Sequence, residues 1–95
     1  MRIELVSRDR GSPQRRIVLD KLPVVIGRSP NADVHLDDRW ASRTHCQIRE
    51  IDGTLIVKDL ASSNGTFVNR NPVSEVALLP GDELAIGITR FEVHY

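Results

Sequence analysis

The chain has 95 residues, enough apolar side chains for one hydrophobic core but not for two, so we expect a single domain over residues 1–95. Thirteen Lys and Arg residues balance thirteen Asp and Glu residues, which argues against general attraction to nucleic acid or to an anionic membrane surface. No apolar run approaches the roughly 20 residues that span a bilayer, and the single Cys46 cannot form an internal disulfide, so we expect a cytoplasmic protein.

Turn signals rich in Gly, Pro, Asn and Asp recur at short intervals along the chain, and in most of the segments between them only strands fit comfortably. Several of these segments alternate apolar and polar residues with a period of two, which is typical of strands that bury one face. The sequence therefore predicts strands near residues 2–6, 16–20, 23–28, 33–35, 44–51, 54–60, 66–68, 72–73, 76–78, 83–86 and 89–95.

Many short strands joined by tight turns favour an all-β sandwich or barrel in a domain of this size. The clearest hairpin is REIDGTLIVKDL, where Asp52 and Gly53 supply the positive φ angles that a two-residue turn requires. The polar stretch SRDRGSPQRR, residues 7–16, is expected to be a loop.

Residues 31–52 allow a second interpretation. This segment contains no Gly or Pro, and Leu36, Trp40, Ile48 and Ile51 have a spacing that a helix also permits. Asp37 or Asp38 could cap such a helix. The local pattern alone does not exclude it.

Three polar clusters place anion-binding side chains beside tight backbone: IGRSPNADV, ASRTHCQI and DLASSNGTFVN. With these motifs, over residues 22–95, the chain resembles the forkhead-associated (FHA) domain, a β-sandwich module that binds phosphothreonine peptides. The family pattern is Gly-Arg, then Ser-Arg-x-His, then Asp-x-x-Ser-(Ser/Thr)-Asn-Gly-Thr-x-Val-Asn. The matching residues are Gly27, Arg28, Ser42, Arg43, His45, Asp59, Ser62, Ser63, Asn64, Gly65, Thr66, Val68 and Asn69.

The resemblance implies an eleven-stranded antiparallel β-sandwich with its binding loops at one end. It favours a strand over the helix at residues 44–51. It also implies roles for individual residues: phosphate binding for Arg28, Ser42 and Ser63, peptide binding for Arg43 and Asn64, and maintenance of the architecture for Gly27 and His45. We further expect peptide contacts from Trp40, by its position before Ser42, and from Asn69, and a structural role for Gly65.

The chemistry of phosphate suits the same residues. A phosphomonoester carries a charge of about −1.5 to −2 at neutral pH and offers three acceptor oxygens. An arginine that is always protonated, together with small hydroxyl donors, matches those oxygens, and Arg28, Ser42 and Ser63 supply that set. We therefore expect a module that reads phosphothreonine proteins in Ser/Thr kinase signalling.

Two other functions compete with this one. A module of the same fold could bind an unphosphorylated protein partner as a scaffold. A small hydrolase could use Ser42, His45 and either Asp59 or Asp82, but no G-x-S-x-G elbow accompanies these residues, so we expect no enzyme. Trp40 could pack in the fold or read the peptide beyond the phosphothreonine, and both interpretations stay open.

The sequence predicts no cofactor and no metal site, since one cysteine and three dispersed histidines lack metal-ligand spacing. The expected partner is a phosphothreonine-containing protein or peptide. The oligomeric state is left open, with a monomer as the default expectation.

Overall fold

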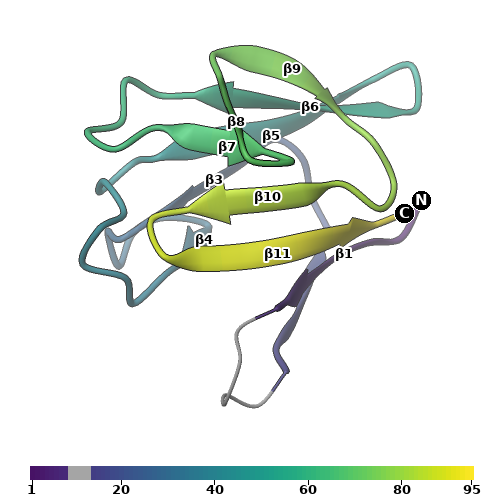
Figure 1. The fold of residues 1–95 in the computed structure, drawn as a ribbon. Helices are drawn as coiled ribbons and strands as arrows, with labels where there is room; N and C mark the ends of the chain where they lie inside the picture. Colours follow the sequence, from purple (N-terminus) through teal and green to yellow (C-terminus); the bar gives the residue numbers. More distant parts are fainter. Residues whose placement is uncertain (9–13) are drawn as a thin grey trace.

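The computed structural model describes residues 1–8 and 14–95 and forms a two-layered β-sandwich (Figure 1). Residues 9–13 of the predicted 7–16 loop lie outside the described residues. The strands are β1 Ile3–Ser7, β2 Arg16–Leu19, β3 Val24–Gly27, β4 Val34–His35, β5 Cys46–Ile51, β6 Thr54–Asp59, β7 Thr66–Val68, β8 Asn71–Val73, β9 Glu75–Leu78, β10 Glu83–Ile86 and β11 Thr89–His94.

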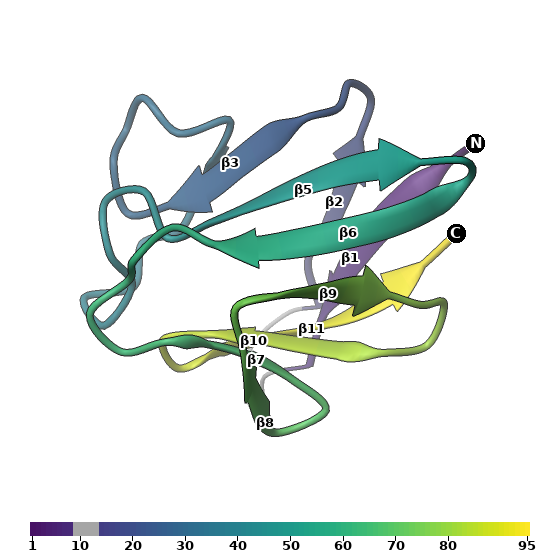
Figure 2. The ribbon, with the colours of Figure 1, turned by 90° about the horizontal axis from the view of Figure 1, so that it is seen from above.

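Both layers are visible from above in Figure 2. The six-stranded sheet has the order β2-β1-β11-β10-β7-β8, and the five-stranded sheet has the order β4-β3-β5-β6-β9. All eleven predicted strands are present, so the predicted β-sandwich is confirmed. One pair departs from the antiparallel pattern: β4 runs parallel to β3, with Ile26 opposite Val34, because the chain loops back through residues 28–33 before it forms β4.

The core is filled by the alternate residues of both sheets, as the period of two predicted. On β11, Phe91 and Val93 are fully buried, whereas Arg90 and His94 face solvent. The hydroxyl of Tyr95 donates to the Leu78 carbonyl across the sandwich at 2.6 Å. This contact ties the C-terminal residue of the chain to the opposite sheet.

The Asp52–Gly53 hairpin is confirmed. Ile51 pairs with Thr54, so two residues form the turn between β5 and β6. The φ angles of Asp52 and Gly53 are 51° and 81°, the positive values that such a turn requires.

The alternative helix over residues 31–52 does not form, and among the described residues the structure contains no helix that could cross a membrane. Ile48 instead lies in a central strand, paired with Val24 on one side and Val57 on the other. Asp38 does not cap a helix; its carboxylate accepts the backbone N–H of Trp40 in a turn. Long-range pairing with two neighbouring strands therefore decides the conformation that local spacing left open.

Candidate functional site

The three predicted motifs lie in loops at one end of the sandwich. Arg28 follows β3 directly, the Ser-Arg-x-His motif ends the 36–45 loop before β5, and Ser63 belongs to the 60–65 loop between β6 and β7. These loops lie together at the end opposite the chain termini (Figures 1 and 2). Residues far apart in the sequence thus meet at one surface.

The backbones of the first two motifs are in direct contact. The Arg28 N–H donates to the Ser42 carbonyl at 2.9 Å, and the Ser29 N–H donates to the Arg43 carbonyl at 3.1 Å. A Cβ atom at position 27 would lie 2.0 Å from the Arg43 carbonyl oxygen. Gly27 is therefore required because the two backbone segments approach too closely to leave room for a side chain.

The Arg28 side chain is exposed and oriented by a single hydrogen bond. Its Nε donates to the Ala41 carbonyl at 3.0 Å. Its two terminal nitrogens have no hydrogen-bond partner among the residues that the structure describes. This geometry fixes the base of the guanidinium group and leaves its outer donors available to an anion.

The third motif is linked to the second through Ser42. The Ser63 N–H donates to the Ser42 Oγ at 2.9 Å, so this oxygen already accepts a bond and its proton is free to be donated elsewhere. The Asn64 side-chain amide donates to the Trp40 carbonyl at 2.8 Å. Backbone and side-chain bonds thus connect Arg28, Ser42 and Ser63 in one cluster.

His45 is the buried centre of this arrangement. Its Nδ1 accepts the Ser42 N–H at 3.0 Å and its Nε2 contacts the Gly65 carbonyl at 2.8 Å. An N–H can only donate and a carbonyl can only accept, so the ring proton must sit on Nε2. The His45 backbone N–H donates to the Ile26 carbonyl at 2.9 Å, so one residue joins all three motifs.

These bonds exclude His45 as the general base of a hydrolase built on Ser42. Both ring nitrogens of His45 are used within the fold, and the ring is fully buried. The Asp59 carboxylate accepts from the Ser62 N–H, the Ser62 hydroxyl and the Thr66 hydroxyl. Burial alone would raise the pKa of Asp59, but these donors outweigh burial and lower the pKa below its ordinary value of 3.8. The carboxylate holds the 60–65 loop and does not orient His45 for proton transfer.

Two predicted peptide-binding residues are exposed beside this cluster. Arg43 faces solvent. Trp40 is 48% exposed, and the guanidinium of Arg39 lies 5.1 Å from the centre of its ring. Trp40 is therefore not a core residue, and this end of the molecule has an exposed aromatic side chain.

Asn69 is not brought together with the other site residues. It lies in the turn after β7, beyond the strand that begins next to Gly65. Its side-chain amide donates to Asp82 at 3.0 Å and accepts the Glu83 N–H at 2.9 Å. These contacts give Asn69 a structural role, and a peptide contact by this residue stays a prediction.

Sequence reasoning missed the role of Asp38. This buried carboxylate accepts the Thr89 hydroxyl at 2.7 Å and the Ile88 and Thr89 N–H groups at 2.9 and 3.1 Å, in addition to the Trp40 N–H. It thereby joins the 36–45 loop to the β10–β11 turn. Ile88, at the tip of that turn, is 71% exposed. Small polar residues are usual in tight turns, so an isoleucine at this position was the one feature of the sequence that marked the β10–β11 turn as unusual.

No group of His, Cys, Asp or Glu that could hold a metal ion occurs within residues 1–8 and 14–95.

Comparison with known protein families matches residues 24–87 to the FHA domain. The chain belongs to the FHA domain family.

Two longer relatives illustrate the similarity in sequence. The FHA domain described here is 44% identical over 72 residues to the oxoglutarate dehydrogenase inhibitor of Corynebacterium diphtheriae, covering 76% of this chain and 50% of that protein. It is also 44% identical over 72 residues to the glycogen accumulation regulator GarA of Mycolicibacterium smegmatis, covering 76% of this chain and 46% of that protein. The chain thus spans about half the length of these relatives.

Solved FHA structures superimpose closely on this one. A structure from a study of phosphothreonine-dependent FHA domain interactions has a TM-score of 0.89 and 33% identity, covering 100% of this chain and 97% of that chain. EmbR of Mycobacterium tuberculosis, in complex with a low-affinity phosphopeptide, has a TM-score of 0.89 and 30% identity, covering 98% of this chain and 24% of that chain. The match in fold extends over essentially the whole chain.

Proposed function

We propose that this FHA domain binds phosphothreonine-containing proteins in Ser/Thr kinase signalling, and that it has no catalytic activity of its own. The observation that carries the proposal is the hydrogen-bonded cluster of Arg28, Ser42 and Ser63 at the loop end. Two similar solved structures support it: one comes from a study of phosphothreonine-dependent FHA domain interactions, and the other is a complex with a phosphopeptide. So do the regulator and inhibitor names of the longer relatives, which describe proteins that act on others.

The proposed division of labour follows the chemistry of each donor. The two terminal nitrogens of Arg28 bind two phosphate oxygens, and the hydroxyls of Ser42 and Ser63 donate to the phosphate from the other side. Asn64, Arg43 and Trp40 contact the peptide around the phosphothreonine, and exposed Ile88 extends that surface. The unit responsible is a single domain over residues 1–95, and we propose that it works in the cytoplasm, where the free thiol of Cys46 stays reduced.

The proposal is tested by titrating the domain with a phosphothreonine peptide library and with the same peptides unphosphorylated. Charge-assisted hydrogen bonds contribute about 1.5–3 kcal/mol each, so loss of the phosphate should weaken binding at least about a hundredfold. A phosphoserine version of the best peptide serves as a second comparison. Equal affinity for the phosphorylated and plain peptides would contradict the proposal and favour the scaffold alternative.

A further inference from the structure

Strand β2 has one open edge. It is the outermost strand of the six-stranded sheet, and among the residues that the structure describes it pairs only with β1. The Ser7 N–H donates to the Arg15 carbonyl at 2.8 Å, which identifies a hydrogen-bonded pair of this antiparallel ladder. Hydrogen-bonded and non-hydrogen-bonded pairs alternate, so Ile17 and Leu19 also direct their backbone groups toward β1. The N–H and C=O groups of Arg16, Val18 and Asp20 must therefore point away from the sheet.

The other outer strands are protected or lack complementary charges. β8 contains Pro72, which cannot donate a backbone hydrogen bond, and β4 is only two residues long. β9 carries Glu75, without a cation on the same strand that could oppose it in a second copy. Along β2 and the residue that follows it, the outward positions are Arg16, Val18 and Asp20, and all three residues are exposed. This order places a cation at one end, an anion at the other and an apolar residue between them.

We propose that β2 pairs with β2 of a second copy of this chain, antiparallel and about a two-fold axis through Val18. Arg16 then lies opposite Asp20 of the second copy, and the pair is repeated on the other side of the axis. Val18, which is 37% exposed, lies opposite Val18 of the second copy. The outward N–H and C=O groups of all three residues gain partners, and the two six-stranded sheets become continuous.

The charges select this register among those that keep the buried faces on one side. A shift of two residues would place Arg16 opposite Val18 and leave Asp20 without a cation. Arg16 already contacts Glu4 of its own chain at 3.2 Å, whereas Asp20 has no ion-pair partner among the described residues. Asp20 is thus available to an arginine supplied by another molecule.

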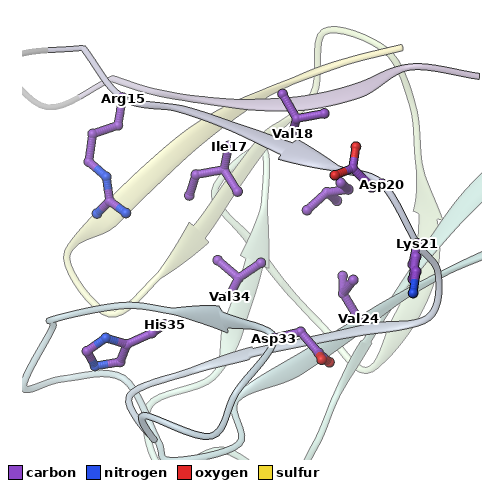
Figure 3. Close-up of a pocket in the computed structure, with 10 residues that line it drawn as sticks. Arg15, Ile17, Val18, Asp20, Lys21, Val24, Asp33, Val34 and His35 are labelled. Atoms are coloured by element: carbon purple, nitrogen blue, oxygen red, sulfur yellow. The ribbon is translucent and has the colours of Figure 1, made fainter.

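A groove beside this edge gives a second reason for pairing. It has a volume of about 430 Å³ and lies between β2 and the β3–β4 edge of the other sheet (Figure 3). Ile17, Val24 and Val34 contribute apolar walls. In the proposed register, the half-buried Ile17 lies opposite Leu19 of the second copy, whose own side chain is buried in its core. The edge of the second copy therefore covers Ile17 and narrows the open side of the groove. Association would then remove apolar surface from water as well as satisfy the strand edge.

The experiment measures the self-association of the wild-type chain and of two charge variants, Arg16→Asp and Asp20→Arg, by sedimentation velocity up to about 1 mM, the range of weak interfaces. The wild type should form a dimer. Each variant places like charges opposite each other twice and should weaken self-association at least about tenfold. An equimolar mixture of the two variants should dimerise again. Positions 16 and 20 are both acidic in Arg16→Asp and both basic in Asp20→Arg, so opposite charges meet at each end of the mixed dimer.

Matched variants separate this result from a general effect of net charge. Lys58→Asp and Glu50→Arg carry the same charge changes on the exposed surface of the other sheet, and both should dimerise like the wild type when measured singly. Val18→Pro removes an N–H that the single domain does not use and should give a monomer, whereas Val18→Thr keeps that N–H and should give a dimer. A monomeric wild type, or a dimer that the β2 variants leave unchanged, would overturn the proposal.

Phosphopeptide binding is measured on the same variants. None of Arg28, Ser42 and Ser63 lies on β2, so monomeric variants should bind phosphopeptide like the wild type. Failure of the dimer and failure of the proposed phosphothreonine site are thereby distinguished.

Discussion

At the scale of single residues, the loop end combines groups used by the fold with groups left for a ligand. Arg28 shows both in one side chain, because Nε is used to contact Ala41 and the terminal nitrogens are not. His45 shows the opposite case, since every polar atom of its ring is used internally. A buried histidine next to a serine therefore stabilises the site without taking part in chemistry.

The first prediction at this scale concerns Arg28→Ala. The variant should lose phosphopeptide affinity by at least about a hundredfold, because it removes the charged donor of the proposed phosphate site. Its free energy of unfolding should fall by no more than about 1.5 kcal/mol, since one hydrogen bond of an exposed side chain is lost. Calorimetric titration and thermal unfolding measure the two effects.

Arg90→Ala, at an exposed position on β11, is the matched control and should bind phosphopeptide like the wild type. Arg28→Lys keeps the charge but loses both the contact to Ala41 and the planar fork, so its affinity should lie between those of Arg28→Ala and the wild type. If Arg28→Ala bound as tightly as the wild type, the phosphate would have to bind elsewhere.

At the scale of elements, the site depends on loops that are held together by buried polar side chains. His45 connects the 36–45 loop to β3 and to the 60–65 loop. Asp38 connects the same loop to the β10–β11 turn. Gly87 is needed in that turn because a Cβ there would lie 2.5 Å from the Asp38 carboxylate. Tight packing of loop on loop gives the site a fixed shape before a ligand binds.

The prediction at this scale concerns Asp38→Asn. Burial would raise the pKa of Asp38, but the donors Thr89, Trp40 and Ile88 outweigh burial and hold the pKa below 3.8. A lowered pKa in the folded state means that the ionised carboxylate stabilises the fold at every pH above 3.8, and that this stabilisation is lost as the pH falls further. At pH 7 the variant should therefore be less stable than the wild type by about 1–3 kcal/mol.

The difference between the two proteins should narrow as the pH is lowered from about 4 toward 2, because the wild-type carboxyl then becomes protonated as well. Thermal unfolding of both proteins across this range provides the measurement. Asp37→Asn changes an exposed neighbour and should leave stability nearly unchanged at each pH. A constant difference between Asp38→Asn and the wild type at all pH values would count against the ionised clamp.

At the scale of the whole molecule, two sheets enclose one core and exclude water from its centre. Cys46 lies in this core with no exposed surface. Burial, with a smaller contribution from the negative charge of Asp59, raises the pKa of its thiol to about 12. The native thiol is therefore both inaccessible and protonated at neutral pH.

Labelling of Cys46 should accordingly report global unfolding. A thiol reagent at pH 8 should react with the native protein at a rate set by opening of the core, and quickly only above the denaturant midpoint. Ser74→Cys, which adds a thiol at an exposed position, should label its new cysteine rapidly in the native state. Rapid labelling of the native wild type would show that the core opens more easily than this packing implies.

Much of the fold could be predicted because its signals are local. Alternating residues such as Phe91 and Val93 mark a half-buried strand, and Asp52 and Gly53 mark a hairpin turn, from a few neighbours in the chain. The candidate site residues were likewise chosen from three short motifs. The helix that the local pattern allowed over residues 31–52 does not form. The pattern could not exclude it, because only the pairing of Ile48 with β3 and β6 places this residue in a sheet.

The sequence by itself determined which residues alternate, where the chain turns and which donors suit a phosphate, because these properties depend on residue type and near neighbours. Only the tertiary structure decided that His45 uses both ring nitrogens within the fold, that Asp38 joins two loops 50 residues apart in the chain, and that β2 keeps an open edge. Each of these depends on hydrogen bonds between segments distant in sequence, and no local pattern specifies which donors and acceptors folding will bring together.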